Sequence, residues 1–144
     1  MMNRIAQLSA LGQAIWLDYI SRDLLAGQLE TLVEEGVAGV TSNPTIFQKA
    51  IAAGGDYAAQ IGKLAAAGRT PHAIYEAIVL QDIAAAADQL RPVYNETHGR
   101  DGFVSLEVRP TLADDTEGTI DEARRLFHTL QRPNVMIKVP ATEA

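Results

Sequence analysis

The chain begins with two stretches in which apolar residues recur every three or four positions. In residues 5–11 this spacing, followed by Gly12, predicts a short amphipathic helix. Ser21 can cap a second helix, whose leucine-rich apolar face ends at Gly36. Between these two helices lies a short apolar run, AIWLD, which predicts a buried strand.

The longest helical pattern lies between Pro44 and Leu90. Thr70 as a cap and Pro71 as a first helical residue predict the start of a new helix there, and Pro92 predicts its end. Glycines predict breaks before that start, at Gly54, Gly55, Gly62 and Gly68.

The remaining pattern alternates strands with one more helix. GVAGVTSN, FVSLEV (103–108) and VMIKV are short, almost wholly apolar strands, and Thr119 with Glu122 forms the T-x-x-E capping box of a helix through Leu130. Such alternation predicts a parallel sheet covered by helices, either an open doubly wound sheet or a closed barrel. Because the chain has no GxGxxG and no GxxxxGK[ST], the α/β barrel is the preferred prediction.

Composition narrows the functional class. The chain has 144 residues, 47% of them hydrophobic, which suits one domain or a large part of one. Its net charge of −6 and scattered basic residues predict no nucleic-acid partner. The absence of cysteine fits a reducing cytoplasm, and the lack of a long apolar run or hydrophobic signal core predicts no membrane partner and a cytoplasmic protein.

Each predicted strand ends with a polar side chain. Asp18, Asn43, Glu107 and Lys138 occupy comparable places in the four strands, and chemistry in parallel α/β folds is assembled at the carboxyl ends of strands. Residues two apart share a face of a strand, so each polar residue shares a face with the residue two before it, in the pairs 16/18, 41/43, 105/107 and 136/138. One consistent face would point all four polar side chains toward the inside of a barrel.

Lys138 lies in an apolar strand with no acid nearby in the sequence. A lysine has an ordinary pKa of about 10.4 and becomes a nucleophile when burial lowers it, so an amine with two carboxylates suggests Schiff-base chemistry. The structural alternatives are that Lys138 extends its ammonium to the rim or forms a buried ion pair with Glu107.

Structural alternatives exist for the other residues as well. Asp18 can be a helix cap or a loop acid, and Asn43 before Pro44 can start a helix. Glu107 needs a partner or a chemical role, because an uncompensated carboxylate in a strand is costly. Three histidines have no metal-ligand spacing and are expected at the surface: His72, His98 and His128.

Five segments together resemble consecutive parts of transaldolases, most closely the bacterial form found alone or fused to a phosphoglucose isomerase. They are WLDYISRDLL, TSNPTIF, GFVSLEV, DTEGTIDEARRL and NVMIKVPAT, in this order. The resemblance implies a (β/α)8 TIM barrel, sugar phosphate substrates of the pentose phosphate pathway, and transfer of a dihydroxyacetone unit from a ketose phosphate to an aldose phosphate. It also implies no metal and no cofactor, since the iminium supplies the polarisation.

Residue roles follow from the resemblance motif by motif. Lys138 matches the Schiff-base lysine, Asp18 the acid/base of carbon–carbon cleavage, Glu107 the acid/base acting through a water, and Asn43 a residue that binds the intermediate. The phosphate-binding arginine of the family lies in the half that this chain lacks, so neither of two arginines near the strands is assigned to phosphate: Arg22 and Arg109.

A full barrel takes roughly 200 residues or more, and the chain supplies four strands. We therefore expect residues 1–144 to be the N-terminal part of a single barrel domain, inactive alone. Two alternatives stay open: a related Schiff-base aldolase, and a non-catalytic half-barrel that self-associates through its open edges.

Overall fold

The computed structural model describes residues 3–143, except for the side chain of Ile46. Its centre is a four-stranded parallel sheet in sequential order, built from β1 (Ile15–Leu17), β2 (Val37–Thr41), β3 (Phe103–Glu107) and β4 (Val135–Lys138). Consecutive strands that pair in parallel must be joined by crossover connections, and in this chain the connections contain helices. The sheet with its connecting helices is the half-barrel of a (β/α)8 TIM barrel that the sequence predicts.

From residue 3 onward, the first half of the chain holds four helices and one π-helical segment. They are α1 (Arg4–Ala10), the π-helical segment Leu24–Gln28, α2 (Leu29–Glu34), α3 (Pro44–Ala53) and α4 (Gly55–Ala66). Ser21 accepts the backbone N–H of Leu24, so its predicted capping role is confirmed. Of the predicted glycine breaks, Gly62 is wrong, because α4 continues through it.

The second half holds α5 (Pro71–Glu96), the 3₁₀ turn Pro110–Leu112 and α6 (Thr116–Leu130). Thr70 caps α5 as predicted, but Pro92 does not end it. The proline lies on the exposed side of the helix, while Leu90 is in the core and Val93 packs against it, and this packing outweighs one lost backbone hydrogen bond.

The predicted capping box of the last helix is also wrong. The side chain of Asp115 accepts the N–H of Gly118, so α6 begins at Thr116 rather than after Thr119. Glu122 is instead buried, paired with arginines. An aspartate at the cap satisfies the same orphan amides that the threonine was predicted to satisfy.

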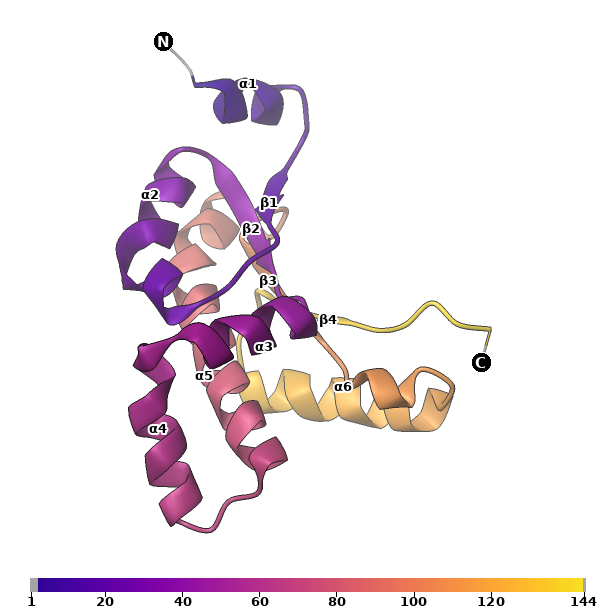
Figure 1. Ribbon diagram of the computed structural model, residues 1–144. Coiled ribbons are helices and arrows are strands. Elements are labelled where there is room, and N and C mark those ends of the chain that lie inside the picture. Colours follow the sequence, from indigo (N-terminus) through magenta and orange to yellow (C-terminus); the bar gives the residue numbers. More distant parts are fainter. Residues whose placement is uncertain (1–2, 144) are drawn as a thin grey trace.

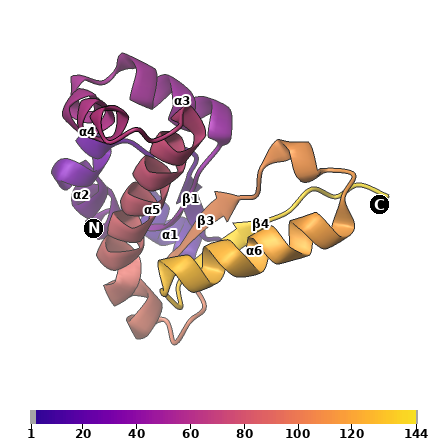
Figure 2. The ribbon, with the colours of Figure 1, turned by 90° about the horizontal axis from the view of Figure 1, so that it is seen from below.

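Helices α2, α5 and α6 lie along one face of the sheet (Figures 1 and 2). The core forms between them and the strand residues of even number in β2 and β3 and odd number in β4, for example Val40, Val104 and Val135. The residues that alternate with them, including Thr41, Ser105 and Lys138, face the other side. We call that side the inner face, since it would line the interior of a closed barrel.

On the inner face, Trp16 lies directly over Gly39 of the neighbouring strand. A Cβ added at Gly39 would come 2.4 Å from the indole ring, so only glycine allows this close approach. The tryptophan therefore fixes the first two strands against each other and confirms that Trp16 points to the inner face.

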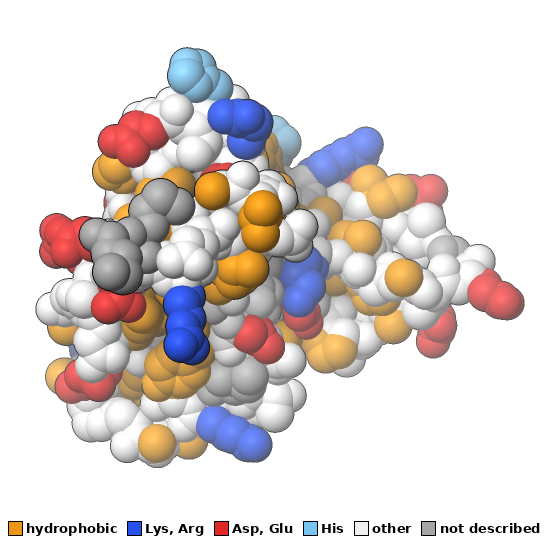
Figure 3. Space-filling model, turned by 90° about the horizontal axis from the view of Figure 1, so that it is seen from above, with side chains coloured by type: hydrophobic (Ala, Val, Ile, Leu, Met, Phe, Trp, Pro, Cys, Tyr) orange, Lys and Arg blue, Asp and Glu red, His pale blue; other side chains and the backbone are white. Residues whose placement is uncertain are grey.

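The surface carries charges of both signs. Figure 3 shows basic side chains scattered, not gathered, on the face that it draws. The three histidines are exposed as predicted. None of the helices in residues 3–143 combines the length and apolarity that crossing a membrane requires.

Candidate active site at the carboxyl ends of the strands

Glu107 and Lys138 are the last residues of β3 and β4, and the strand register places them side by side. The Lys138 Nζ donates a hydrogen bond of 2.6 Å to Glu107 Oε1. The acid that the sequence lacks near Lys138 thus comes from the adjacent strand, 31 residues earlier. We call Glu107 and Lys138 the mouth pair.

The mouth pair is accessible to solvent. The side chain of Lys138 is 47% exposed and that of Glu107 is 29% exposed. The predicted shielding of the amine is therefore absent in residues 3–143, because β4 is an edge strand with a neighbour on one side only. The alternative of a buried ion pair is wrong for the same reason, although the predicted pairing of the two residues is confirmed.

Two hydroxyls join the mouth pair on the inner face. Lys138 Nζ lies 3.4 Å from Thr41 Oγ1, and the Ser105 hydroxyl donates to Thr41 Oγ1 at 2.8 Å. From the sequence alone, Thr41 and Ser105 are assigned only to a face of their strands. The signal that could have found them was present, since each lies two residues before a predicted site residue on the same strand face.

Asn43 follows β2 and begins α3. Its Oδ1 accepts the N–H of Thr45 at 2.9 Å, and its backbone carbonyl accepts the N–H of Phe47 at 2.9 Å. The helix-start interpretation of the Asn-Pro pair is therefore confirmed. Its predicted role toward a substrate stays a prediction.

Asp18 follows β1 and is exposed. Its carboxylate makes no hydrogen bond or ion pair with any other described residue. Because β1 and β4 are the two edges of the sheet, Asp18 and Lys138 lie three strands apart along the same carboxyl end. The structure thus brings Glu107 and Lys138 into contact, with Asp18 and Asn43 at the ends of the other two strands.

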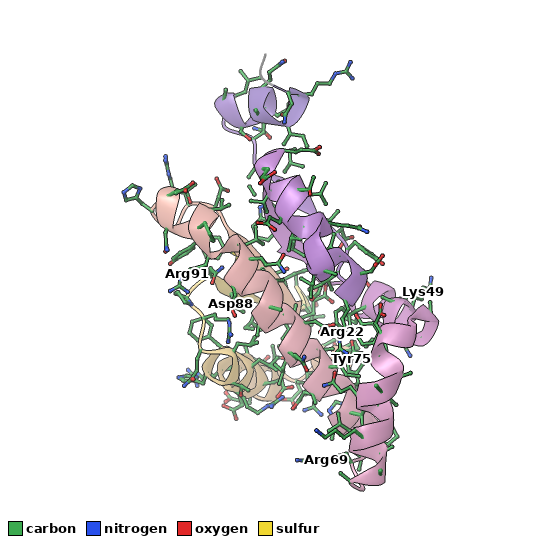
Figure 4. All side chains as sticks on the ribbon, turned by 90° about the vertical axis from the view of Figure 1, so that its left-hand side faces the viewer. Arg22, Lys49, Arg69, Tyr75, Asp88 and Arg91 are labelled. Atoms are coloured by element: carbon green, nitrogen blue, oxygen red, sulfur yellow. The ribbon has the colours of Figure 1, made fainter. Side chains whose placement is uncertain are left out.

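A small cavity of about 80 Å³ lies beside Glu107, between the strand ends and helices α3, α5 and α6. Tyr75 of α5 lines it, and burial together with the charge of Glu107 raises the pKa of its hydroxyl. The phenol therefore stays protonated next to the mouth pair at neutral pH. Figure 4 shows Tyr75 beside α5, close to Arg22 in that view.

Both arginines near the strands pair with acidic side chains. Arg22 is bound to Asp82, 3.2 Å away, and Arg109 pairs with Glu122 at 3.5 Å. In residues 3–143, no three acidic or histidine side chains gather in a way that would hold a metal ion.

Comparison with known proteins adds an independent line of evidence. Residues 15–144 match the family model described as transaldolase/fructose-6-phosphate aldolase. The chain is 50% identical to a transaldolase of Thiobacillus denitrificans over 98% of its length, 53% identical to a transaldolase of Thermobifida fusca over 96%, and 48% identical to transaldolase 2 of a Nostoc species over 99%.

The match covers nearly all of the chain but a smaller share of these relatives: 40% of the Thiobacillus protein and 38% of the other two. The matched residues include all four strands and the mouth pair. The chain therefore belongs to the transaldolase/fructose-6-phosphate aldolase family.

Proposed function

We propose that the chain carries the Schiff-base part of a transaldolase active site, within a single (β/α)8 barrel domain of which residues 1–144 form the N-terminal part. The reaction would transfer a dihydroxyacetone unit from sedoheptulose 7-phosphate or fructose 6-phosphate to an aldose phosphate in the pentose phosphate pathway. The observation that supports it most directly is the 2.6 Å contact between an accessible amine and a carboxylate at the carboxyl ends of parallel strands.

In the proposed reaction Lys138 forms the covalent bond. Its neutral amine attacks the ketone carbon of the sugar, and loss of one water from the carbinolamine leaves an iminium. Glu107 contacts this amine and would move protons on and off the carbinolamine oxygen through a water. The Thr41 hydroxyl near the same amine would fix the direction in which the amine points.

Cleavage and transfer follow from the iminium. Asp18 would remove the proton of the C4 hydroxyl, the C3–C4 bond breaks, and its electron pair neutralises the iminium to give an enamine and a free aldehyde. Asn43 would hydrogen-bond the hydroxyls of the retained three-carbon unit. The enamine then attacks a second aldehyde, and water releases the product from Lys138.

Borohydride trapping tests this proposal. Residues 1–144 would be joined to the remaining 60% or so of the Thiobacillus relative and incubated with fructose 6-phosphate and borohydride, beside the 144-residue chain alone. We expect mass spectrometry to find the reduced adduct on Lys138 of the chimera and none in a Lys138→Arg variant. An unlabelled Lys138 in a folded chimera would remove both the transaldolase and the simple aldolase.

A second assay separates transfer from cleavage. With erythrose 4-phosphate present, a transaldolase forms a seven-carbon ketose, and without an acceptor it turns over slowly. A related Schiff-base aldolase would instead release dihydroxyacetone at a rate that does not need the acceptor.

A second candidate function, a self-associating half-barrel, is favoured by the surface area. The chain exposes 8698 Å², whereas a compact monomer of 15.5 kDa exposes about 7,200 Å². The excess of about 1,500 Å² exceeds the roughly 800 Å² that each partner of a standard interface buries. A twofold axis along the strands would pair each β4 with the β1 of a second copy in parallel and close eight strands.

Light scattering on the 144-residue chain tests this candidate. A closed pair has twice the 15.5 kDa mass of the chain. Met136→Asp, on the inner face, should separate the copies, while Phe127→Asp on α6 is a matched control because Phe127 is similarly exposed, 44% against 42%. A monomeric wild-type chain would remove this candidate.

A further inference from the structure

The loop between β1 and α2 carries the proposed base Asp18 at its start. Asp18 and Tyr19 are exposed, but the next residues are held firmly: Ile20 is in the core and the buried Ser21 caps the following helical segment. Arg22 then reaches two other helices. The exposed start of the loop, Asp18 and Tyr19, is thus followed directly by three residues that are held in place.

Arg22 makes the long-range contacts of this loop. Its backbone N–H donates to the hydroxyl of Tyr57 at 3.0 Å, and its guanidinium lies over the Tyr57 ring, 4.6 Å from the ring centre. The same guanidinium donates to Asp82 Oδ1 at 3.2 Å, to the carbonyl of Asp56 at 2.9 Å and to the Gln60 side chain. One arginine therefore ties the β1–α2 loop to α4 and α5, and Figure 4 shows it between these helices.

Two of the partners of Arg22, Tyr57 and Asp82, are buried. Asp82 is 2% exposed and Tyr57 is 1% exposed, and Asp82 Oδ2 has no hydrogen-bond partner among the described residues. A buried carboxylate with one oxygen unsatisfied depends on the attraction of the arginine for its place in the core. We call Arg22, Tyr57 and Asp82 the clamp.

We propose that the clamp is a positioning device for Asp18, holding the β1–α2 loop so that this carboxylate stays at the carboxyl end of β1. The inference rests on the proposed function for the role of Asp18. Its mechanical part, that the clamp holds the β1–α2 loop in place, does not depend on that function. Asp18 has no described partner of its own, so the anchors that follow it in the chain set its position.

The chain offers a matched control on the same helix. Asp88 of α5 also pairs with an arginine, Arg132, at 2.8 Å, but Asp88 is 59% exposed and its partner comes from the turn after α6. Figure 4 shows Asp88 further along α5, away from Arg22. Asp88→Asn thus makes the same chemical change as Asp82→Asn without touching the loop.

Hydrogen exchange of the 144-residue chain tests the mechanical part. In Asp82→Asn we expect the amides of residues 18–24 to exchange at least 10-fold faster than in wild type, while those of β3 change no more than in Asp88→Asn. Tyr57→Phe removes the hydroxyl that accepts the Arg22 N–H and also interacts with Asp82, and it serves if Asp82→Asn fails to fold. Equal acceleration in loop and strand, or none in the loop, would overturn the clamp.

A second measurement, in the chimera with the Thiobacillus relative, distinguishes positioning from folding. Asp18 acts after the iminium forms, so Asp82→Asn should slow carbon–carbon cleavage about 10-fold and leave borohydride trapping of Lys138 unchanged. Trapping and cleavage that fall in parallel would contradict the positioning role. If wild type shows no trapping at all, the proposed function fails while the exchange result still decides the clamp.

Discussion

The mouth pair and the ion pair of the clamp lie in opposite surroundings. Lys138 contacts Glu107 at 2.6 Å on an edge strand, with nearly half of the lysine side chain exposed. Arg22 contacts Asp82 at 3.2 Å between two helices, with the aspartate almost wholly buried. The first pair joins residues that are direct neighbours across two strands, whereas the second joins residues 60 positions apart.

The difference shows that position decides what an ion pair can do. An exposed pair contributes little to folding, so its amine is available to a substrate at small cost. A buried pair cannot lose one partner without leaving a charge in the core, so it serves to hold backbone segments together. We therefore expect changes at the mouth to affect the covalent chemistry directly, and changes at the clamp to affect stability and, through the β1–α2 loop, the cleavage step.

The largest expected effect is at Lys138. Lys138→Arg keeps the positive charge beside Glu107 but cannot form a Schiff base, so transfer by the chimera should fall more than about 1,000-fold. The urea midpoint of the 144-residue chain should stay almost unchanged, because the exposed pair survives. Lys49→Arg on α3 is the control, and Figure 4 shows Lys49 at the outer surface. Retained transfer in Lys138→Arg would refute the assignment.

The second effect is on stability. Arg22→Met leaves Asp82 charged and alone in the core, which should lower the free energy of unfolding by about 3 kcal/mol. Arg132→Met makes the same substitution at the exposed pair with Asp88 and should cost less than about 1 kcal/mol. Urea unfolding followed by circular dichroism measures both. Equal losses would mean that burial does not distinguish the two pairs.

The two aspartates of α5 should respond to pH in opposite directions. Burial raises the pKa of Asp82, so the folded chain holds this proton more tightly than the unfolded chain does. Its contribution to stability falls as pH rises above the ordinary pKa of about 3.9. The hydrogen bond from Arg132 lowers the pKa of Asp88, whose contribution is present above pH 3.9 and is lost as pH falls below it.

Urea midpoints between pH 3 and 7 test this pH prediction. The difference between wild type and Asp82→Asn should change above about pH 3.9, and the difference between wild type and Asp88→Asn below it. Parallel curves for both variants across the whole range would contradict the assignment of the shifts.

The smallest effect is expected at Thr41. Thr41→Val removes the hydroxyl that lies between Ser105 and Lys138, so trapping in the chimera should slow several-fold while stability changes by about 1 kcal/mol or less. Thr129→Val on α6 is the control, since its hydroxyl donates only within its own helix. A trapping rate equal to that of the control would show that Thr41 does not direct the amine.

Local signals predicted the elements well and their ends less well. Strand residues at 103–107 and 135–138 follow from apolar runs, and the start of α5 follows from Thr70 and Pro71. The end of α5 does not follow from the local sequence, because packing of its apolar face extends the helix past Pro92. Local patterns give the preference of a segment for helix or strand. Where a helix could end at either of two residues, packing against the core decides between them.

The sequence by itself determined the order of strands and helices, the polar residue at or just after the end of each strand, and the shared strand face of Glu107 and Lys138, because these depend on periods of two and 3.6 along the chain. Only the tertiary structure decided that Lys138 meets Glu107 in the open and that Arg22 meets Asp82 in the core. Those contacts depend on strand register and helix packing between distant segments, and no local pattern encodes the distance between two side chains.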